Sequence, residues 1–260
     1  MGTIKTILVP FDFSAAAKAA LDYAVNYAGH SKEMHIKLLH SDEHTDSSYL
    51  EKDFQAIRKG YGKNLKAAFS WTISRKQLTQ AILKARETYH ADLIIMGTAG
   101  ATGTGGAASH TSELVLEANC PVLVIPQRVN EFRIQKIALV LGRDEIDDTS
   151  DLATLLDVVR RFNARVHVLT IENEPGEYGY SAPEEKNEKL LEHFLESFYA
   201  DHTYITNPAV AEGISRFTAD KDIDMIAIMP GNHRRFGKRT AGQLTNYLTL
   251  NSKTPVLAID

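Results

Sequence analysis

The feature that most constrains the fold of this chain is a weak internal repeat with a period of about 130 residues. Three segments of the first half recur in the second with their spacing kept: Lys5–Val9 as Lys136–Val140, Asp92–Met96 as Asp224–Met229, and Pro121–Ile125 as Pro255–Ile259. Duplication of one unit is the simplest cause of such a pattern. The length of 260 residues agrees, since single domains usually have about 100–200. We therefore expect two domains, residues 1–126 and 134–260, joined by the polar linker Gln127–Arg133.

Within the first unit, strand-like runs alternate with helical patterns. Ile4–Pro10 is almost continuously apolar, which is typical of a strand buried on both faces of a parallel sheet. Ser14 can cap the helix that follows, because its hydroxyl can accept from free amides of the first turn. That helix has small apolar residues on one face, suited to close packing on a sheet: Ala17, Ala20, Leu21, Ala24, Val25 and Ala28. Later strands are expected at Met34–His40, Leu65–Ile73, Asp92–Met96 and Val122–Ile125, with helices near 50–61, 78–89 and 109–119.

This alternation fixes the predicted fold class. Strands joined by helices imply right-handed crossovers and a parallel sheet covered on both faces. The prediction is α/β, with two tandem doubly wound five-stranded parallel sheets of the Rossmann-like type. In the second unit, helices are expected near 149–163, 184–200, 208–221 and 243–251, with a short third strand at about Thr203–Thr206.

Composition and charge exclude several classes of protein. A formal charge of −4 and an isoelectric point near 6.2 provide no basic excess for binding nucleic acid. No apolar run approaches the ~20 residues that span a membrane, and the run before Asp12 is too short for a signal peptide. Cys120 is the only cysteine, so no internal disulfide and no cysteine-based metal site can form, which suits a reducing compartment. We expect a cytoplasmic protein.

Candidate ligand-binding residues follow the first and fourth expected strands. In open parallel sheets, ligands bind beyond the carboxyl ends of strands, where the winding direction reverses. Val9–Ser14 follows the first strand, and the glycine-rich stretch 97–108 follows the fourth and leads into a helix. Glycines let backbone amides approach a phosphate, and a helix N-terminus adds free amides and a favourable dipole. Ser109, Thr111 and Ser112 add hydroxyl donors, although the same glycines could serve only as tight turns.

Two better-known phosphate motifs do not fit this stretch. A dinucleotide fingerprint follows the first strand and needs an acid at the end of the next strand, where this chain has Ile125-Pro126-Gln127. A P-loop needs a Lys and a Ser or Thr after its last glycine, and none follows Gly105.

Several polar residues near these segments have two interpretations each. Asp12 can bind ribose hydroxyls or a metal, or it can cap the next helix. The cluster His40–Asp46 resembles a metal loop, but a solvated loop is the simpler interpretation because spacing fixes no third ligand. His110 could contact an anion or face water, and Met96 could be a ligand wall or core.

These residues also carry a family resemblance, which covers nearly the full length. Ile7–Ser14, Ala91–Gly100 and Asn119–Ile125 resemble the universal stress protein family in a tandem arrangement, with an adenine nucleotide alpha hydrolase-like fold. Nucleotide-binding members have glycine, two residues, glycine, nine residues, then glycine and Ser or Thr. This chain keeps Gly97 and Gly100, but its final pair falls on Ala108-Ser109, so the loop is about two residues short and its last glycine is alanine.

The resemblance implies a site for an adenine nucleotide in the first domain. Adenosine would lie against Val9, Pro10, Asp12 and the backbone of Ser41, with phosphates on Gly97, Gly100, Ser109 and His110. The complete set of candidate nucleotide-binding residues is Val9, Pro10, Phe11, Asp12, Ser41, Met96, Gly97, Thr98, Gly100, Ala108, Ser109 and His110. No catalytic residue and no metal ligand is assigned.

The second unit lacks this pattern. Met229–Arg239 replaces the glycine-rich stretch, and Gly142 stands where the acidic residue is expected, so no nucleotide is expected there. The basic side chains of that segment could hold another anion, but an ordinary solvated loop is the simpler interpretation. By resemblance, such a degenerate half packs on the first as a built-in dimer partner, and pairing of two chains is also open.

The leading hypothesis is a stress-response module that binds ATP or a related adenine nucleotide, with or without Mg²⁺, and signals through its bound state. It is not expected to be an enzyme, since no nucleophile, base and orienting group are recognisable, although slow ATP hydrolysis stays open. The alternative is a non-nucleotide interaction module that binds a protein partner or a lipid-like ligand. A third, a relative of ATP-dependent ligases, needs a catalytic loop that the sequence does not show.

Overall fold

The computed structural model describes residues 4–42, 47–62, 65–100, 107–129, 131–142, 146, 149–172, 182–230 and 241–259. The chain divides into two compact units, residues 2–132 and 133–260, a division that falls within the expected linker.

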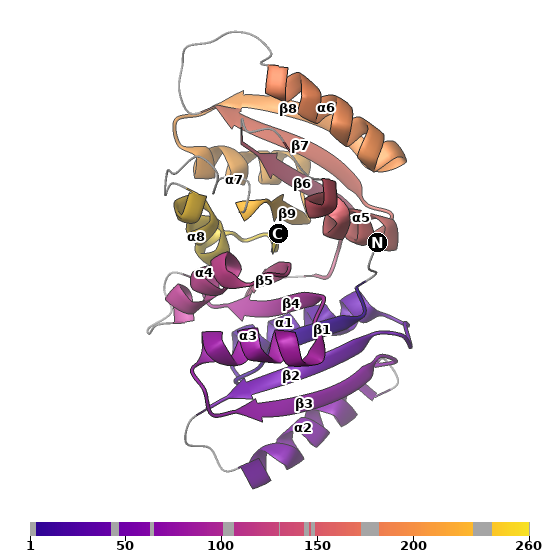
Figure 1. Cartoon of the computed structure of the whole chain (residues 1–260), viewed down its shortest axis with the longest axis vertical. Helices are drawn as coiled ribbons and strands as arrows, with labels where there is room; N and C mark the ends of the chain where they lie inside the picture. The colour runs from indigo at the N-terminus through magenta and orange to yellow at the C-terminus, as the bar shows by residue number, and fades with distance from the viewer. Residues whose placement is uncertain are drawn as a thin grey trace. The chain divides into compact units, whose positions relative to one another are not determined.

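The N-terminal unit is a parallel sheet of five strands in the order β3-β2-β1-β4-β5 (Figure 1). The chain runs from β1 outward to β3, returns to the other side of β1, and continues to β5, so the winding reverses between β1 and β4. Its elements are β1 (Thr6–Pro10), α1 (Ala15–Ala28), β2 (His35–Ser41), α2 (Ser47–Tyr61), β3 (Ala68–Ser74), α3 (Leu78–Tyr89), β4 (Leu93–Thr98), α4 (Ala107–Glu117) and β5 (Val122–Pro126).

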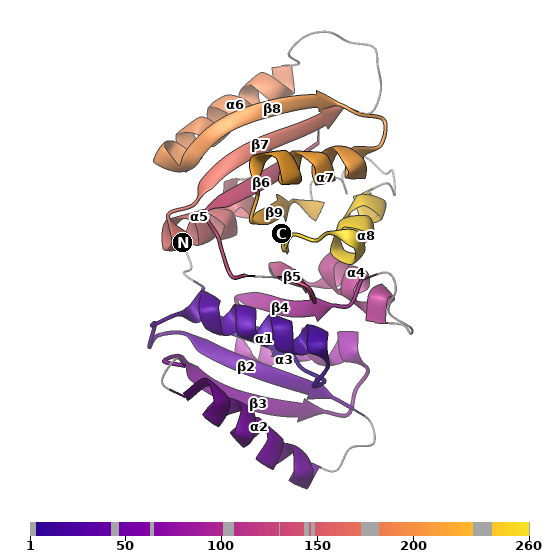
Figure 2. The same ribbon diagram turned by 180° about the vertical axis from the view of Figure 1, so that it is seen from behind.

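Helices cover both faces of this sheet, as the alternating pattern predicts. Helices α1 and α2 lie on one face, and α3 and α4 lie on the other (Figures 1 and 2). The predicted small-residue face of α1 is buried, and the four residues of β1 after Thr6 are buried as well. A strand without an exposed side chain is stable only between two helical layers, which is why the continuous apolar run identified it.

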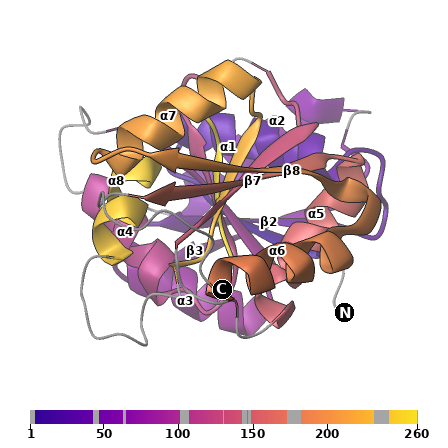
Figure 3. The same ribbon diagram turned by 90° about the horizontal axis from the view of Figure 1, so that it is seen from above.

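The C-terminal unit repeats the same strand order, β8-β7-β6-β9-β10, again with parallel pairs. Figure 3 shows β7 and β8 lying between α7 on one side and α6 on the other. Its elements are β6 (Lys136–Leu141), a 3-10 helix (Thr149–Leu152), α5 (Ala153–Phe162), β7 (Arg165–Glu172), α6 (Ala182–Leu195), a 3-10 helix (Glu196–Phe198), β8 (Tyr199–Thr206), α7 (Val210–Lys221), β9 (Met225–Ile228), α8 (Ala241–Asn251) and β10 (Val256–Ala258).

Both units use one aspartate in the same way to start the sheet. Asp92 Oδ2 accepts hydrogen bonds from the backbone amides of Lys5 and Thr6, at 2.9 and 2.8 Å. Asp224 Oδ2 does the same for Gln135 and Lys136, at 2.8 and 2.9 Å. In each unit this carboxylate satisfies amides at the amino end of the central strand. These bonds match Lys5 with Gln135, so the structural repeat is shifted by one residue from the predicted match of Lys5 with Lys136.

The third strand of the second unit was predicted wrongly as a short strand at Thr203–Thr206. β8 begins at Tyr199, and the helix expected to reach residue 200 ends at Leu195. β8 is an edge strand with half-exposed side chains, so its polar residues hide the apolar period that identifies a strand. Pairing with β7 determines its length, because Asp201 lies opposite His167 and accepts from its Nδ1 at 3.0 Å.

Within the described ranges, no helix is both long and apolar enough to cross a membrane.

Candidate ligand pocket at the carboxyl ends of β1 and β4

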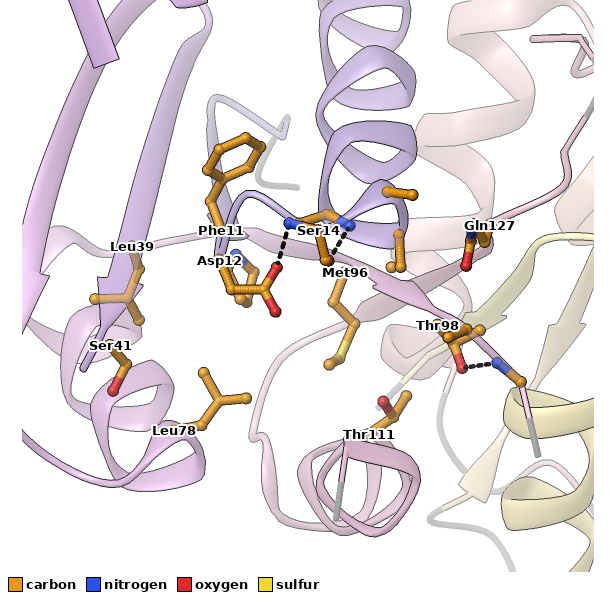
Figure 4. Close-up of a pocket in the computed structure, with 17 residues that line it drawn as sticks. Phe11, Asp12, Ser14, Leu39, Ser41, Leu78, Met96, Thr98, Thr111 and Gln127 are labelled. Carbon is orange, nitrogen blue, oxygen red and sulfur yellow. Dashed lines mark hydrogen bonds between the residues drawn. The ribbon is translucent and has the colours of Figure 1, made fainter. Parts of the chain in front are cut away.

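A pocket of about 460 Å³ lies in the N-terminal unit where the winding of the sheet reverses. Small-molecule sites typically have ~300–1,000 Å³ and occur at this position in open α/β sheets. It is surrounded by residues at the ends of β1, β2 and β4, by the first turns of α1 and α3, and by Thr111 of α4 (Figure 4). Its lining is Pro10, Phe11, Asp12, Ser14, Ala15, Ala16, Ala17, Leu39, Ser41, Leu78, Met96, Gly97, Thr98, Ala99, Gly100, Thr111 and Gln127.

The turn between β1 and α1 presents the carboxylate of Asp12 to this pocket. Asp12 Oδ1 accepts from the amide of Ser14 at 3.0 Å, and Ser14 Oγ accepts from the amide of Ala17 at 3.1 Å. Ser14 is therefore the helix cap that the sequence indicated. Asp12 is exposed, and its carboxylate points into the hollow (Figure 4). One residue thus fixes the turn with one oxygen and keeps the other available to a ligand hydroxyl.

Phe13 holds the turn in an uncommon backbone conformation. Its φ is 65°, in the left-handed region that costs a bulky residue ~1–3 kcal/mol. Its ring packs among Phe11, His40 and Phe54 at centroid distances of 5.1, 5.6 and 5.3 Å. Buried aromatic contacts offset the backbone strain, so packing behind the pocket determines the path of the loop in front of it.

His40 adds a buried hydrogen bond to the same turn. Its Nδ1 donates to the carbonyl oxygen of Phe11 at 2.8 Å, which fixes the proton on that nitrogen. The sequence placed His40 in a possible metal cluster, but the structure gives it this structural role. Residues 43–46 of that cluster lie outside the described residues, and the described parts of the chain contain no group of three His, Cys, Asp or Glu that could hold a metal.

Gly97 allows α1 to approach β4 closely. A Cβ atom at this position would lie 2.0 Å from the carbonyl oxygen of Ala16, far inside contact distance. The sequence assigned Gly97 to a glycine-rich loop, but the structure places it inside β4, opposite Ile125 of β5. Glycine is required here by the packing of a helix against a strand, and the φ of this residue does not demand it.

Beyond β4, the chain turns with its own hydrogen bonds. The amide of Gly100 donates to Thr98 Oγ1 at 3.2 Å, and the amide of Gln127 donates to the carbonyl of Thr98 at 2.9 Å. Gly100 has a φ of 82°, which favours glycine. The first turn after β4 is therefore stabilised by Thr98 without a ligand.

The remaining walls are mainly apolar. Leu39, Leu78 and Met96 line the pocket between the strand ends and α3 (Figure 4). Ser41 Oγ donates to the carbonyl oxygen of Lys76, which ties the end of β2 to the loop before α3. Mainly apolar walls with a few polar groups are typical of small-molecule sites.

Most of the candidate residues meet in this one pocket. Those that line it are Pro10, Phe11, Asp12, Ser41, Met96, Gly97, Thr98 and Gly100. Val9 does not line it, because it is fully buried within β1. The side chains of Ala108, Ser109 and His110 lie outside the described residues, although α4 begins at Ala107.

Sequence analysis missed part of the lining. In the sequence, Leu39 fell within an expected strand and Leu78 at the start of an expected helix, and Gln127 was assigned to the linker, yet all three line the pocket. Strand register could have found Gln127, since it follows β5 directly and β5 pairs with β4. No local pattern separates the two leucines from ordinary core residues.

The open parallel sheet, with a pocket at its switch point, defines a doubly wound α/β protein. The family model of the universal stress proteins matches residues 3–126. The family likeness is therefore found for the N-terminal domain, residues 3–126.

Solved structures extend the likeness to both domains. A universal stress protein from Archaeoglobus fulgidus is 12% identical, with a TM-score of 0.68 over 99% of this chain and 97% of that one. A functionally unknown protein from Pseudomonas aeruginosa is 18% identical, with a TM-score of 0.65 over 98% and 92%. The cytoplasmic domain of a prokaryotic cation chloride cotransporter is 12% identical, with a TM-score of 0.60 over 100% and 96%.

At these identities the likeness establishes the two-domain fold alone. The names of these neighbours show that the fold occurs in proteins of different roles, so function has to be argued from the pocket. A comparison with curated protein sequences found none that matches this chain.

Proposed function

We propose that the N-terminal domain is a stress-response binding module for an adenine nucleotide, with the nucleoside part in the pocket between β1 and β4. The observation that carries this proposal is the position of Asp12. Its carboxylate lies at the end of β1, beside a pocket of nucleoside size, in a domain of the universal stress protein family. A carboxylate that accepts from ribose hydroxyls there would fix the sugar, and the apolar walls would hold the base.

Binding rather than catalysis is the role that this lining supports. Acid-base or nucleophilic chemistry needs a reactive group, a base and an orienting group within hydrogen-bond reach. Among the described lining residues, Asp12 is the only titratable one, and it bonds to the amide of Ser14. We therefore assign no catalytic residue and treat slow ATP hydrolysis as a side reaction to be measured. Mg²⁺ enters this proposal only with a polyphosphate, whose oxygens it would bridge.

The C-terminal domain and the cellular setting belong to the same proposal. We assign no nucleotide to the second domain, because Gly142 replaces the acid at the end of its first strand. The bound state of the first domain would be communicated to a protein partner in the cytoplasm, a reducing compartment that suits a buried, single Cys120.

Isothermal titration calorimetry with adenosine, AMP and ATP, each with and without Mg²⁺, tests the proposal. We expect at least one of the three to bind, and Asp12→Ala to weaken that binding about tenfold or more, because the hydroxyl acceptor is lost. Asp53→Ala, at an exposed position of α2, is the matched control and should leave affinity unchanged. If none of the three ligands binds at millimolar concentration, the alternative, an interaction module without nucleotide, takes its place.

A further inference from the structure

The phosphate count of the ligand is the next question, and its answer rests on the proposed function. Asp12 carries the only formal charge among the described residues that line the pocket, and that charge is negative. The side chains of Arg75, Lys76 and Arg128 are exposed near the same edge of the sheet but do not line the pocket. A phosphate chain leaving this pocket would therefore meet no cationic side chain in the described lining.

The segments that follow β1, β2 and β4 in the sequence have the same charge balance. Residues 11–14, 42–46 and 99–106 follow β1, β2 and β4, and they contain no Lys or Arg. Their charged residues are all acidic: Asp12, Asp42, Glu43 and Asp46. Each added phosphate charge would lie near the carboxylate of Asp12 with no lysine or arginine in the described lining to neutralise it, which weakens binding by Coulomb repulsion.

The two glycines expected to hold phosphate are already used by the protein. Gly97 lies within β4 and faces the backbone of Ala16, so it serves helix packing. The amide of Gly100 donates to Thr98 Oγ1, and this bond would have to break before that amide could bind an anion. The loop that follows is also about two residues shorter than the family's phosphate-binding loop. A shorter loop contains fewer backbone amides that could replace a cation.

We propose that this pocket selects adenosine, or an adenine nucleotide with a single phosphate, over ATP. The nucleoside needs only the apolar walls and the acceptor oxygens of Asp12, both of which the structure provides. The triphosphate adds several negative charges for which the described lining has neither a cation nor an unoccupied Gly100 amide. Mg²⁺ bound to the triphosphate would neutralise part of this charge and so reduce the difference in affinity between ATP and adenosine.

Calorimetry in chelator-treated, Mg²⁺-free buffer gives the first test. Adenosine and AMP are expected to bind at least about tenfold more tightly than ATP, a difference that corresponds to ~1.4 kcal/mol. Equal or tighter binding of ATP under these conditions would overturn the selectivity while leaving the proposed nucleotide function intact. Absence of binding by all three compounds would instead remove the proposed function itself, so the two failures are distinct.

A charge-gain variant tests the physical cause. Gln127 lines the pocket next to Thr98 and Gly100, where a phosphate chain would pass, so Gln127→Lys places a cation there. It should tighten ATP binding several-fold while changing adenosine binding little. Gln55→Lys adds the same charge at an exposed position of α2 and should change neither affinity. An unchanged ratio of ATP to adenosine affinity in a folded Gln127→Lys protein would contradict the charge argument.

Discussion

The two domains share one sheet topology but differ at the carboxyl edge of the sheet. Each has the same five-strand order and an aspartate that holds the start of its central strand, Asp92 in one and Asp224 in the other. At the carboxyl edge, the N-terminal domain has Asp12 and a pocket, whereas the C-terminal domain has Gly142 after its first strand. The amino edge has kept its hydrogen bonds, while the carboxyl edge has changed its chemistry.

Strand register identifies the position that separates them most. Leu93 of β4 pairs with Ile7 of β1, and Met225 of β9 pairs with Ile137 of β6, so Gly97 corresponds to Met229. Where Gly97 leaves room for the backbone of α1, Met229 is a large buried side chain. α1 begins directly after residues 11–14, whereas α5 begins only at Ala153, after a 3-10 helix. In the N-terminal domain, the clearance at Gly97 thus accompanies a tight turn and a pocket. In the C-terminal domain, where Met229 fills the same position, the connection to the next helix is longer.

The largest expected effect comes from removing that clearance. Gly97→Ala would place a Cβ 2.0 Å from the carbonyl oxygen of Ala16, so α1 or β4 must shift. We expect a loss of about 3 kcal/mol or more in unfolding free energy of the N-terminal domain. Trp71, the only tryptophan, lies in β3 of this domain, so its fluorescence during urea unfolding reports the change selectively.

Gly60→Ala is the matched control for this substitution. Gly60 lies in α2 with no atom within 4 Å of a new Cβ, so alanine should be neutral or stabilising by about 0.5–1 kcal/mol. Equal unfolding midpoints for the two variants would refute the close-packing role of Gly97.

The shared aspartates give the next largest effect. Asp92→Ala and Asp224→Ala each leave two backbone amides without their acceptor, and we expect a loss of about 1–3 kcal/mol in the corresponding domain. Asp224→Ala should lower the unfolding free energy more than Asp92→Ala does, because the Asp224 side chain is 4% exposed and also pairs with Arg133. Tryptophan fluorescence for the first variant and circular dichroism for the second would measure the two losses. A larger loss at Asp92 would contradict this ranking.

Acid should distinguish the domains through different groups. Burial, followed by the charge of Lys37, lowers the pKa of His35 below its ordinary 6.5, so the folded N-terminal domain favours neutral His35. This contribution to stability is present above pH 6.5 and is lost as pH falls below that value, because the unfolded chain binds the proton more readily.

In the C-terminal domain the relevant group is Asp201. Burial alone would raise its pKa, but hydrogen bonds from Lys221 and His167 lower it below the ordinary 3.8. The contribution of Asp201 to the stability of the C-terminal domain is therefore complete above about pH 4 and is lost only as pH falls further. Urea unfolding should be measured at pH 7, 5.5 and 3.5. As pH falls, the unfolding free energy reported by tryptophan fluorescence, which follows the N-terminal domain, should decrease before that of the C-terminal domain. His35→Gln should reduce the decrease between pH 7 and 5.5. An unchanged early loss in His35→Gln would assign it to another group.

The smallest expected effect is a null result that sharpens the comparison. Gly142→Asp restores an acid after β6, but Met229 still occupies the position of Gly97. We expect no adenosine binding by the second domain, measured by calorimetry in an Asp12→Ala background. Binding in that double variant would show that the carboxylate alone makes the site.

Much of the pocket lining could be predicted from sequence because its residues follow strands. Asp12 and Ser14 come directly after an apolar run, and the strand-turn-helix pattern places them at the carboxyl edge. Leu39 and Leu78 could not be assigned to the lining, because local patterns do not tell a pocket wall from a core. β8 was underestimated for a related reason, since pairing with β7 rather than apolar period sets its length.

The sequence by itself determined the order of strands and helices, the duplication, and the acid after the first strand. The strands can be recognised because burial on both faces of a parallel sheet requires nearly continuous runs of apolar residues. The role of Gly97 was decided only by tertiary structure. Gly97 of β4 meets the backbone of Ala16, which lies in α1 packed on the sheet. Contacts between residues far apart in sequence leave no local pattern, so a glycine that suggests a phosphate loop in sequence can serve packing in the fold.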